Sequence, residues 1–116
     1  MKKLRYSLLF VLPLLLISFL LKSCIIQNPQ PEDCEVTEIL VAKIYEGGVK
    51  DIVFALENGD FYYINRGLEQ GLTLEDMRAE VLNKKVTLHL AKTWTGTTNH
   101  IAQLALGEHV IFTEFN

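Results

Sequence analysis

The chain is poor in the residues that build cross-linked scaffolds and fibres. Two cysteines in 116 residues exclude a disulfide-rich fold. Three prolines and seven glycines exclude a collagen-like or Pro/Gly-rich fibre. The length allows one domain and excludes a multidomain enzyme. With 49% hydrophobic and 22% charged residues, the chain is also too apolar to belong to the disordered class.

Residues for nucleophilic catalysis are equally scarce. The only serines are Ser7, Ser18 and Ser23, so Ser-His-Asp catalysis is excluded in the rest of the chain unless a threonine replaces serine. Cys34 has no histidine near it in sequence, which argues against Cys-His catalysis. Residues 66–71 have neither the spacing nor the lysine of a phosphate-binding loop. We therefore predict no catalytic residue and no enzyme activity.

The three histidines do not have the spacing of metal ligands. His89, His100 and His109 are not three or four residues apart, and no Cys-x-x-Cys motif accompanies them. His89 and His100 could still meet in space if their strands were neighbours. We predict neither a metal site nor a cofactor, and we expect these histidines in surface or turn positions.

The first 23 residues have the layout of a secretory signal or membrane anchor. Three basic residues in the first five precede the uncharged run 8–21. The following Leu21-Lys22-Ser23-Cys24 resembles the lipobox of bacterial lipoproteins, in which Cys24 would be lipidated; Lys22 stands where that motif usually has a small uncharged residue. An uncleaved transmembrane anchor is the alternative, although the 16 residues of 6–21 are shorter than the ~20 that span a bilayer. Cleavage and free secretion is the third possibility.

A polar tether is expected to follow at residues 24–35. Two prolines, Pro29 and Pro31, prevent a helix there. At its end, Cys34 would form a disulfide with Cys24, pair between chains, or stay reduced, and lipidation of Cys24 would exclude the first of these. Whether the first 23 residues belong to a lipoprotein signal, remain as an anchor or are cleaved, the rest of the chain lies outside the cytoplasm, because the basic residues stay inside. We expect it at the membrane, in the cell envelope.

The exported part is acidic. Once the four basic residues before position 24 are set aside, seven basic residues face 14 acidic ones, a formal net charge of −7. That sign opposes binding to nucleic acid and to anionic lipid surfaces.

Residues 36–116 are predicted to form one mainly β domain. Strands are expected over 36–45, 51–57, 60–65, 86–92, 101–106 and 110–115, the last two forming a terminal hairpin or one bent strand. Asn58-Gly59 predicts a hairpin turn, and Thr73 an N-cap for a helix ending at Asn83. In the strand 86–92, Val86, Leu88 and Leu90 are expected inside, and Thr87, His89 and Ala91 outside. Residues 93–99 are expected to be a loop.

This order resembles the OB-fold, a small five-stranded, partly open barrel, here with one helix between strands three and four. The alternative is an open antiparallel sheet with one helix packed across it. Residues 50–115, with YYINRGLEQGL, NKKVTL and an exposed WT, also resemble a set of short bacterial envelope proteins. That resemblance implies an OB-like domain and an envelope location, and no activity.

Four residues are candidates for ligand binding. Trp94 lies in the loop between strands four and five, which OB-folds use for ligands; the alternative is that it folds back over the barrel mouth. One ring of Tyr62-Tyr63 faces outward, and Tyr62 is our candidate. Arg66 is the one basic residue in a loop bounded by glycines, where it pairs with Glu69 or receives an anion. His89 faces outward on its strand. The carboxylate pairs Glu57/Asp60 and Glu75/Asp76 have structural explanations in a turn and a helix first turn.

The sequence thus predicts a membrane-anchored, extracytoplasmic, non-enzymatic module that binds an envelope protein or a glycan. A nucleic-acid-binding OB-fold is the alternative, which the charge of −7 disfavours. A metal-dependent enzyme using His89 and His100 is the third hypothesis.

Overall fold

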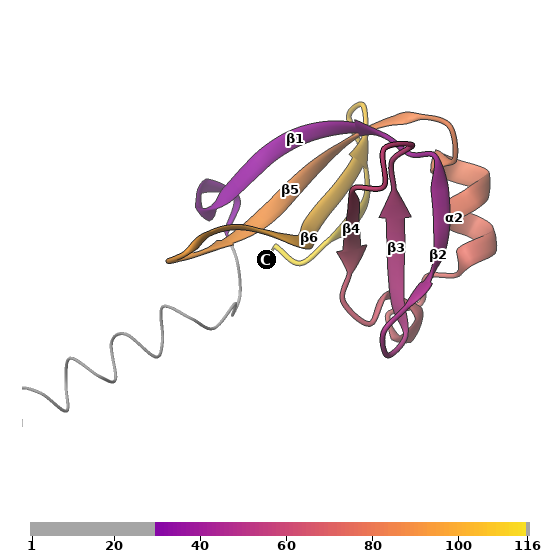
Figure 1. The fold of residues 1–116 in the computed structure, drawn as a ribbon, viewed down its shortest axis with the longest axis horizontal. Helices are drawn as coiled ribbons and strands as arrows, with labels where there is room; N and C mark the ends of the chain where they lie inside the picture. Colours follow the sequence, from indigo (N-terminus) through magenta and orange to yellow (C-terminus); the bar gives the residue numbers. More distant parts are fainter. Residues whose placement is uncertain (1–29, 116) are drawn as a thin grey trace, which may run out of the picture.

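A computed structural model describes residues 30–115. Seven strands form one sheet, and one α-helix packs against it (Figure 1). In chain order these are β1 (Cys34–Leu40), β2 (Lys43–Gly47), β3 (Asp51–Ala55), β4 (Phe61–Ile64), α2 (Leu74–Val81), β5 (Lys85–Thr93), β6 (Gly96–Leu106) and β7 (His109–Thr113). Two 3-10 turns, η1 (Pro31–Asp33) and η2 (Gly67–Glu69), complete the secondary structure of this part of the chain.

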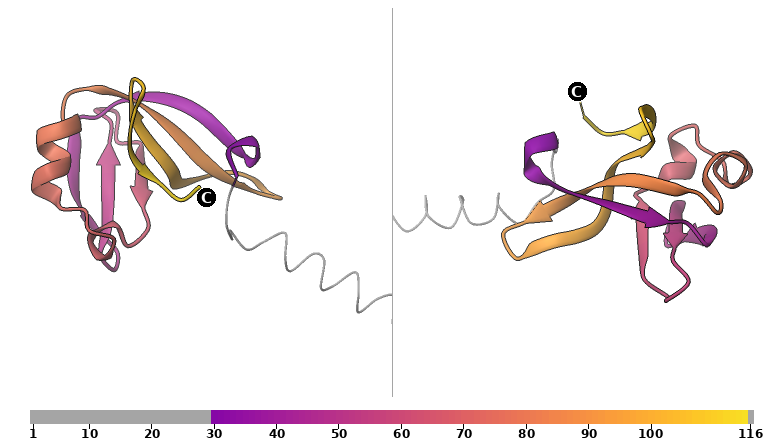
Figure 2. Two further views of the ribbon diagram at one scale, coloured as in Figure 1. Left: turned by 180° about the vertical axis from the view of Figure 1, so that it is seen from behind. Right: turned by 90° about the horizontal axis from the view of Figure 1, so that it is seen from above.

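The sheet is open and mixed. Its strand order is β1-β5-β6-β4-β3-β2. The seventh strand, β7, pairs with β6 and is not part of this linear order. Neighbouring strands are antiparallel except β4 and β6, which pair in parallel at Tyr63 and His100. Figures 1 and 2 show β1, β5 and the start of β6 as a curved arm, with α2 at the opposite end of the domain.

The prediction of a mainly β domain with one helix after the third predicted strand is confirmed, but the predicted five-stranded, partly open barrel is replaced by an open mixed sheet of seven strands. The predicted first strand breaks at Val41 and Ala42 into β1 and β2, and the terminal segment becomes β6 and β7. At the break, the Val41 amide donates to the carbonyl of Lys84 and the Ala42 amide to the carbonyl of Ala55. The two halves therefore diverge to different partners, and the sheet stays open.

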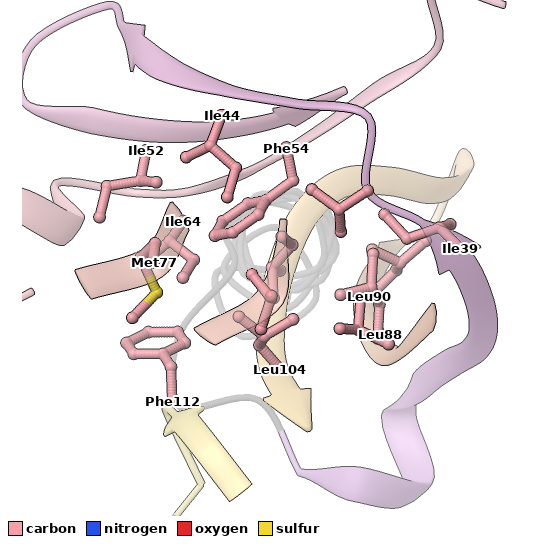
Figure 3. Close-up of a cluster of buried hydrophobic side chains, with 14 residues drawn as sticks. Ile39, Ile44, Ile52, Phe54, Ile64, Met77, Leu88, Leu90, Leu104 and Phe112 are labelled. Atoms are coloured by element: carbon pink, nitrogen blue, oxygen red, sulfur yellow. The ribbon is translucent and has the colours of Figure 1, made fainter. Parts of the chain in front are cut away.

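The core lies between the sheet and α2. Phe54 is fully buried, and Ile44 and Tyr62 lie opposite it on the two neighbouring strands. Figure 3 shows Met77 of α2 beside Ile64 and Phe112. The helix and β7 therefore each contribute a side chain that covers the core. The buried cluster consists of Ile39, Val41, Ile44, Ile52, Phe54, Ile64, Met77, Val81, Val86, Leu88, Leu90, Ile101, Leu104 and Phe112.

Helix α2 begins and ends as predicted. The Asp76 amide donates to the hydroxyl of Thr73 at 3.0 Å, which is the N-cap hydrogen bond. Asn83, with φ of 63°, takes the left-handed conformation just past the helix end. Arg78 then fixes the helix to the sheet, because its Nη2 donates to the carbonyl of Ile44 at 2.9 Å.

Three local predictions need correction. Strand β1 begins at Cys34 rather than Val36. Ala91 is buried, not exposed, because the β5–β6 register shifts around Leu90 and breaks the alternation. Residues 93–99 are not a loop: the strands continue until Thr93 lies opposite Gly96, leaving a two-residue turn at Trp94 and Thr95. The β-branched threonines there favour strand over loop.

The predicted anchor of residues 1–23, Cys24 and the tether up to residue 29 lie outside the described residues. Within 30–115, no helix has the length and apolar character needed to span a membrane. The last part of the tether is a 3-10 turn with Pro31 in its first turn.

Substitution Gly59→Val is expected to weaken the β3–β4 hairpin. Gly59 has φ of 96° in the Asn58-Gly59 turn, where the Asp60 amide also donates to Asn58 Oδ1 at 2.8 Å. A Cβ would meet no atom within 4 Å, so the loss comes from backbone conformation alone, about 1–3 kcal/mol for a β-branched residue. Urea unfolding measures it. Gly59→Asn is the control and should lose less, because asparagine tolerates positive φ; equal stability of Gly59→Val and wild type would contradict the assigned turn.

Candidate functional site

The four residues predicted to bind ligand are not gathered at one place. Trp94 lies in the turn of the β5–β6 hairpin, and 68% of its surface is exposed, so it does not fold back over the sheet. Arg66 lies after β4 with φ of 50° and forms an ion pair with Glu69 at 3.3 Å. Its amide donates to Asp51 Oδ1 at 2.8 Å, so the structural role proposed for Arg66 is the one observed.

The two neighbouring tyrosines point to opposite faces, as predicted, but Tyr62 takes the inner position. Tyr62 lies opposite Phe54 and packs against the buried cluster. Tyr63 lies opposite Val53 and, across the parallel pairing, opposite His100. The outward ring is therefore that of Tyr63.

His89 lies in the middle of β5 and is half-buried. Its ring meets Phe115 edge to face, with centroids 5.5 Å apart, and its Nδ1 atom is buried without a hydrogen-bond partner among the described residues. Across residues 30–115, no three His, Cys, Asp or Glu side chains come together in a way that would hold a metal ion.

His100 is the buried histidine, contrary to the expected surface or turn position. Only 9% of it is exposed. Its Nε2 lies 2.9 Å from both carboxylate oxygens of Glu114, and its ring meets Tyr63 edge to face at 5.8 Å. The Glu114 amide also donates to the carbonyl of Ala102, so the segment after β7 is fixed on β6.

Substitution Glu114→Ala is expected to lower the free energy of unfolding by about 1–3 kcal/mol. It leaves the buried imidazole of His100 without its partner, and a buried polar group without a hydrogen bond is costly. Chemical denaturation measures the loss. Glu108→Ala, in the exposed turn between β6 and β7, is the control and should stay within about 0.5 kcal/mol. Equal effects of the two variants would show that the pair contributes nothing.

Cys34 is buried at the start of β1. Its thiol lies 3.4 Å from the carbonyl oxygen of Gln30, toward which it donates. Burial raises the pKa of the Cys34 thiol, with a further increase from Asp33 that Lys92 partly opposes. The thiol therefore stays protonated at neutral pH, which makes it a poor nucleophile.

The most distinctive surface is the outer face of β2, β3 and β4. Tyr45, Val53 and Tyr63 lie opposite one another across the three strands, and Lys43, Ala55 and Phe61 form the next row. Directly opposed residues share one face of a sheet. We call these six residues the aromatic face.

The aromatic face has larger side chains on its two outer strands than on its middle strand, an arrangement that we call the trough. Its floor on β3 consists of small side chains, Val53 and Ala55, each about 6% exposed. Its walls are larger: Tyr45 on β2 and Phe61 on β4 are each 44% exposed. Because neighbouring strands are about 4.8 Å apart, the two walls rise from backbones about 10 Å apart.

Three surface depressions meet at one end of this trough, around the β3–β4 turn. The largest, about 800 Å³, lies between β2 and β3 and includes Lys43, Tyr45 and Glu57 in its lining. The second, about 320 Å³, includes Asp60, Phe61 and Asn99, and also Tyr62, one of the residues predicted to bind ligand. The third, about 260 Å³, is lined by Leu40, Leu56, Glu57 and Asn58. The surface therefore combines aromatic rings with one cationic, two anionic and two amide side chains.

Comparison of the chain with protein-family models, curated proteins and solved structures gave no match. The resemblance to short envelope proteins accordingly stays a prediction.

Sequence reasoning missed the aromatic face, although a signal for it was present. Lys43/Tyr45 and Phe61/Tyr63 alternate with period two, which places each pair on one side of its strand. The continuous apolar run of β3 hid the phase of the alternation, since Ile52 to Ala55 are all buried. Only the register between strands shows that the outward residues of all three strands meet.

Proposed function

We propose that the chain is a membrane-anchored, extracytoplasmic binding module without enzyme activity, and that its aromatic face binds a neutral glycan. The aromatic trough, with its small floor and polar end, is the single observation that carries this proposal. The anchor and the envelope location rest on the sequence of residues 1–35.

The form of the trough supports a sugar rather than a protein surface. Aromatic rings stack on the C–H face of a pyranose ring, and a few polar groups at the edge orient the ligand. The hydroxyl groups of a sugar would bond to Lys43, Glu57, Asp60 and Asn99 at the polar end. A stable protein interface uses about 20–30 residues on each side, far more than this trough offers.

The charges support a neutral ligand. Lys43 is the one cationic side chain among the residues that line the three depressions, and it is accompanied by Glu57 and Asp60. The part of the chain after residue 23 has a net charge of −7. Phosphate-bearing polymers need a positively charged groove, so nucleic acid is the weaker candidate.

An OB-like arrangement is part of this proposal. β1 and β2 stand at the two ends of the strand order and are consecutive in the chain, as the two halves of a bent first strand would be. In OB-folds, the face of strands two and three binds oligosaccharides and oligonucleotides. Those strands correspond to β3 and β4, which carry the floor and one wall of the trough.

The test is a glycan array probed with the full chain in detergent. We expect binding to neutral envelope oligosaccharides and none to phosphorylated ones. A parallel fluorescence titration with single-stranded DNA at physiological salt should show no micromolar binding. An array without any signal, together with either DNA binding or a specific protein partner crosslinked in membranes, would overturn the glycan assignment.

A further inference from the structure

The β5–β6 hairpin presents the only tryptophan of the chain at the end of the domain where β1 begins. Cys34 of β1 lies opposite Ala91, three residues before Trp94. The hydroxyl of Thr97 donates to the carboxylate of Glu35, which joins the start of β1 to the other arm of the hairpin. Trp94 thus extends about 10 Å beyond Cys34 at a strand rise of about 3.4 Å per residue.

The hairpin tip is uncharged in an acidic domain. No Asp, Glu, Lys or Arg occurs between Lys92 and Glu108. The polar groups of the turn bond to one another: the hydroxyls of Thr93 and Thr95 are 2.8 Å apart, and the Thr95 amide donates to the Thr93 hydroxyl. Moving this tip out of bulk water therefore has a small desolvation penalty.

The chain length keeps the tip near any membrane to which the N-terminus is attached. Gln30 lies against Cys34, since its carbonyl accepts from the Cys34 thiol. The six residue-to-residue steps from Cys24 to Gln30 extend at most about 20 Å. A tether this short makes the encounter of Trp94 with the bilayer intramolecular, at high effective concentration.

We propose that Trp94 inserts into the headgroup region of the anchoring membrane and is the second attachment point of the domain. This inference rests on the proposed anchor. Tryptophan is enriched at membrane interfaces because its ring is apolar and its N–H polar. The partner is the uncharged part of the lipid interface, because acidic residues Glu32, Asp33 and Glu35 near the tip oppose anionic headgroups.

Two attachment points would orient the domain. Figures 1 and 2 show the β5–β6 tip and α2 at opposite ends in every view. With Trp94 in the interface, α2 points away from the membrane. Trp94 is absent from the linings of the three depressions, so the glycan site and the membrane contact are separate surfaces.

The tryptophan fluorescence of the full chain in vesicles of phosphatidylcholine and phosphatidylethanolamine tests the membrane contact directly, because Trp94 is the only tryptophan in the sequence. We expect blue-shifted emission, quenching by lipids brominated near the headgroup, and several-fold weaker quenching by aqueous iodide than for an exposed tryptophan. The matched control carries Trp94→Phe with Ala79→Trp on the exposed face of α2, and should show the reverse pattern. The principal measurement uses the unsubstituted chain, so it does not depend on the folding of the variant.

Flotation of the same vesicles separates the two proposals. A chain that floats with the vesicles but whose Trp94 is quenched by iodide as strongly as the control overturns the membrane contact alone. A chain that does not float overturns the anchor, and with it this inference. Addition of phosphatidylglycerol should not increase the contact; a marked increase would show that electrostatic attraction, not Trp94, holds the tip.

Discussion

Replacement of Phe54 by alanine is expected to lower the free energy of unfolding by about 3–5 kcal/mol. Phe54 is fully buried at the centre of β3, with Ile44 and Tyr62 opposite it on the two neighbouring strands. Its removal leaves a cavity that strands on both sides cannot fill without breaking their register. The total free energy of unfolding of a native domain is about 5–15 kcal/mol, so the variant should lose a large part of its stability. Thermal unfolding followed by circular dichroism should show a fall of at least roughly 12 °C in Tm.

The same residue type on the opposite face supplies the control. Phe61 lies one strand away on β4 and is 44% exposed. Phe61→Ala should change the free energy of unfolding by no more than about 0.5–1 kcal/mol. If the two variants were equally unstable, or Phe54→Ala unfolded like wild type, the assignment of inner and outer faces would be wrong.

The double substitution Tyr45→Ala/Phe61→Ala is expected to weaken glycan binding by at least roughly 30-fold while the fold is kept. These side chains form the two walls of the trough, and neither belongs to the buried cluster. If each ring stacks on the ligand, together they contribute at least about 2 kcal/mol, which corresponds to a roughly 30-fold weaker affinity. Titration of the folded variant with the best neutral oligosaccharide from the array measures it.

The matched control is Val110→Ala on β7. Val110 is 45% exposed, as much as the wall residues, but it lies outside the aromatic face. It should bind the oligosaccharide like wild type. Equal affinity of the double variant and wild type would place the ligand elsewhere, and equal loss in both variants would indicate non-specific apolar binding.

Much of the fold could be predicted because local signals determine it. Thr73 caps a helix because its hydroxyl reaches the Asp76 amide, and Gly59 turns a hairpin because it tolerates positive φ. These residues act within three or four positions of themselves. Their prediction therefore needs no knowledge of the rest of the chain.

The break between β1 and β2 could not be predicted in this way. Val41 and Ala42 carry no turn signal, and their amides are satisfied by Lys84 and Ala55, far away in sequence. The pairing of His100 with Glu114 is likewise invisible locally, since it depends on the segment after β7 lying on β6. The two strands of the β5–β6 hairpin were predicted but their length was not: the predicted loop over 93–99 gave too little weight to the β propensity of its threonines.

Prediction of the candidate site depends on which residues of each strand point inward and which point outward. The expectation that Tyr62 and Tyr63 split across two faces was correct, but the face of each followed from the register with Phe54 and Val53. One residue of shift exchanges the whole set of outward side chains. The sequence left the exposure of Trp94 as one of two alternatives, and its position beyond the start of β1 required the pairing of Cys34 with Ala91.

Chemical-shift mapping tests the central claim most directly. The amide spectrum of the full chain in detergent micelles is followed by NMR while the neutral oligosaccharide with the strongest array signal is added. We predict that the shifts concentrate on β2, β3 and β4, around Tyr45, Ala55 and Phe61, and on the turn at Asn58 and Gly59. Shifts confined to the β5–β6 hairpin or to α2, or no shifts at saturating sugar, would contradict the assignment of the aromatic face as the ligand site.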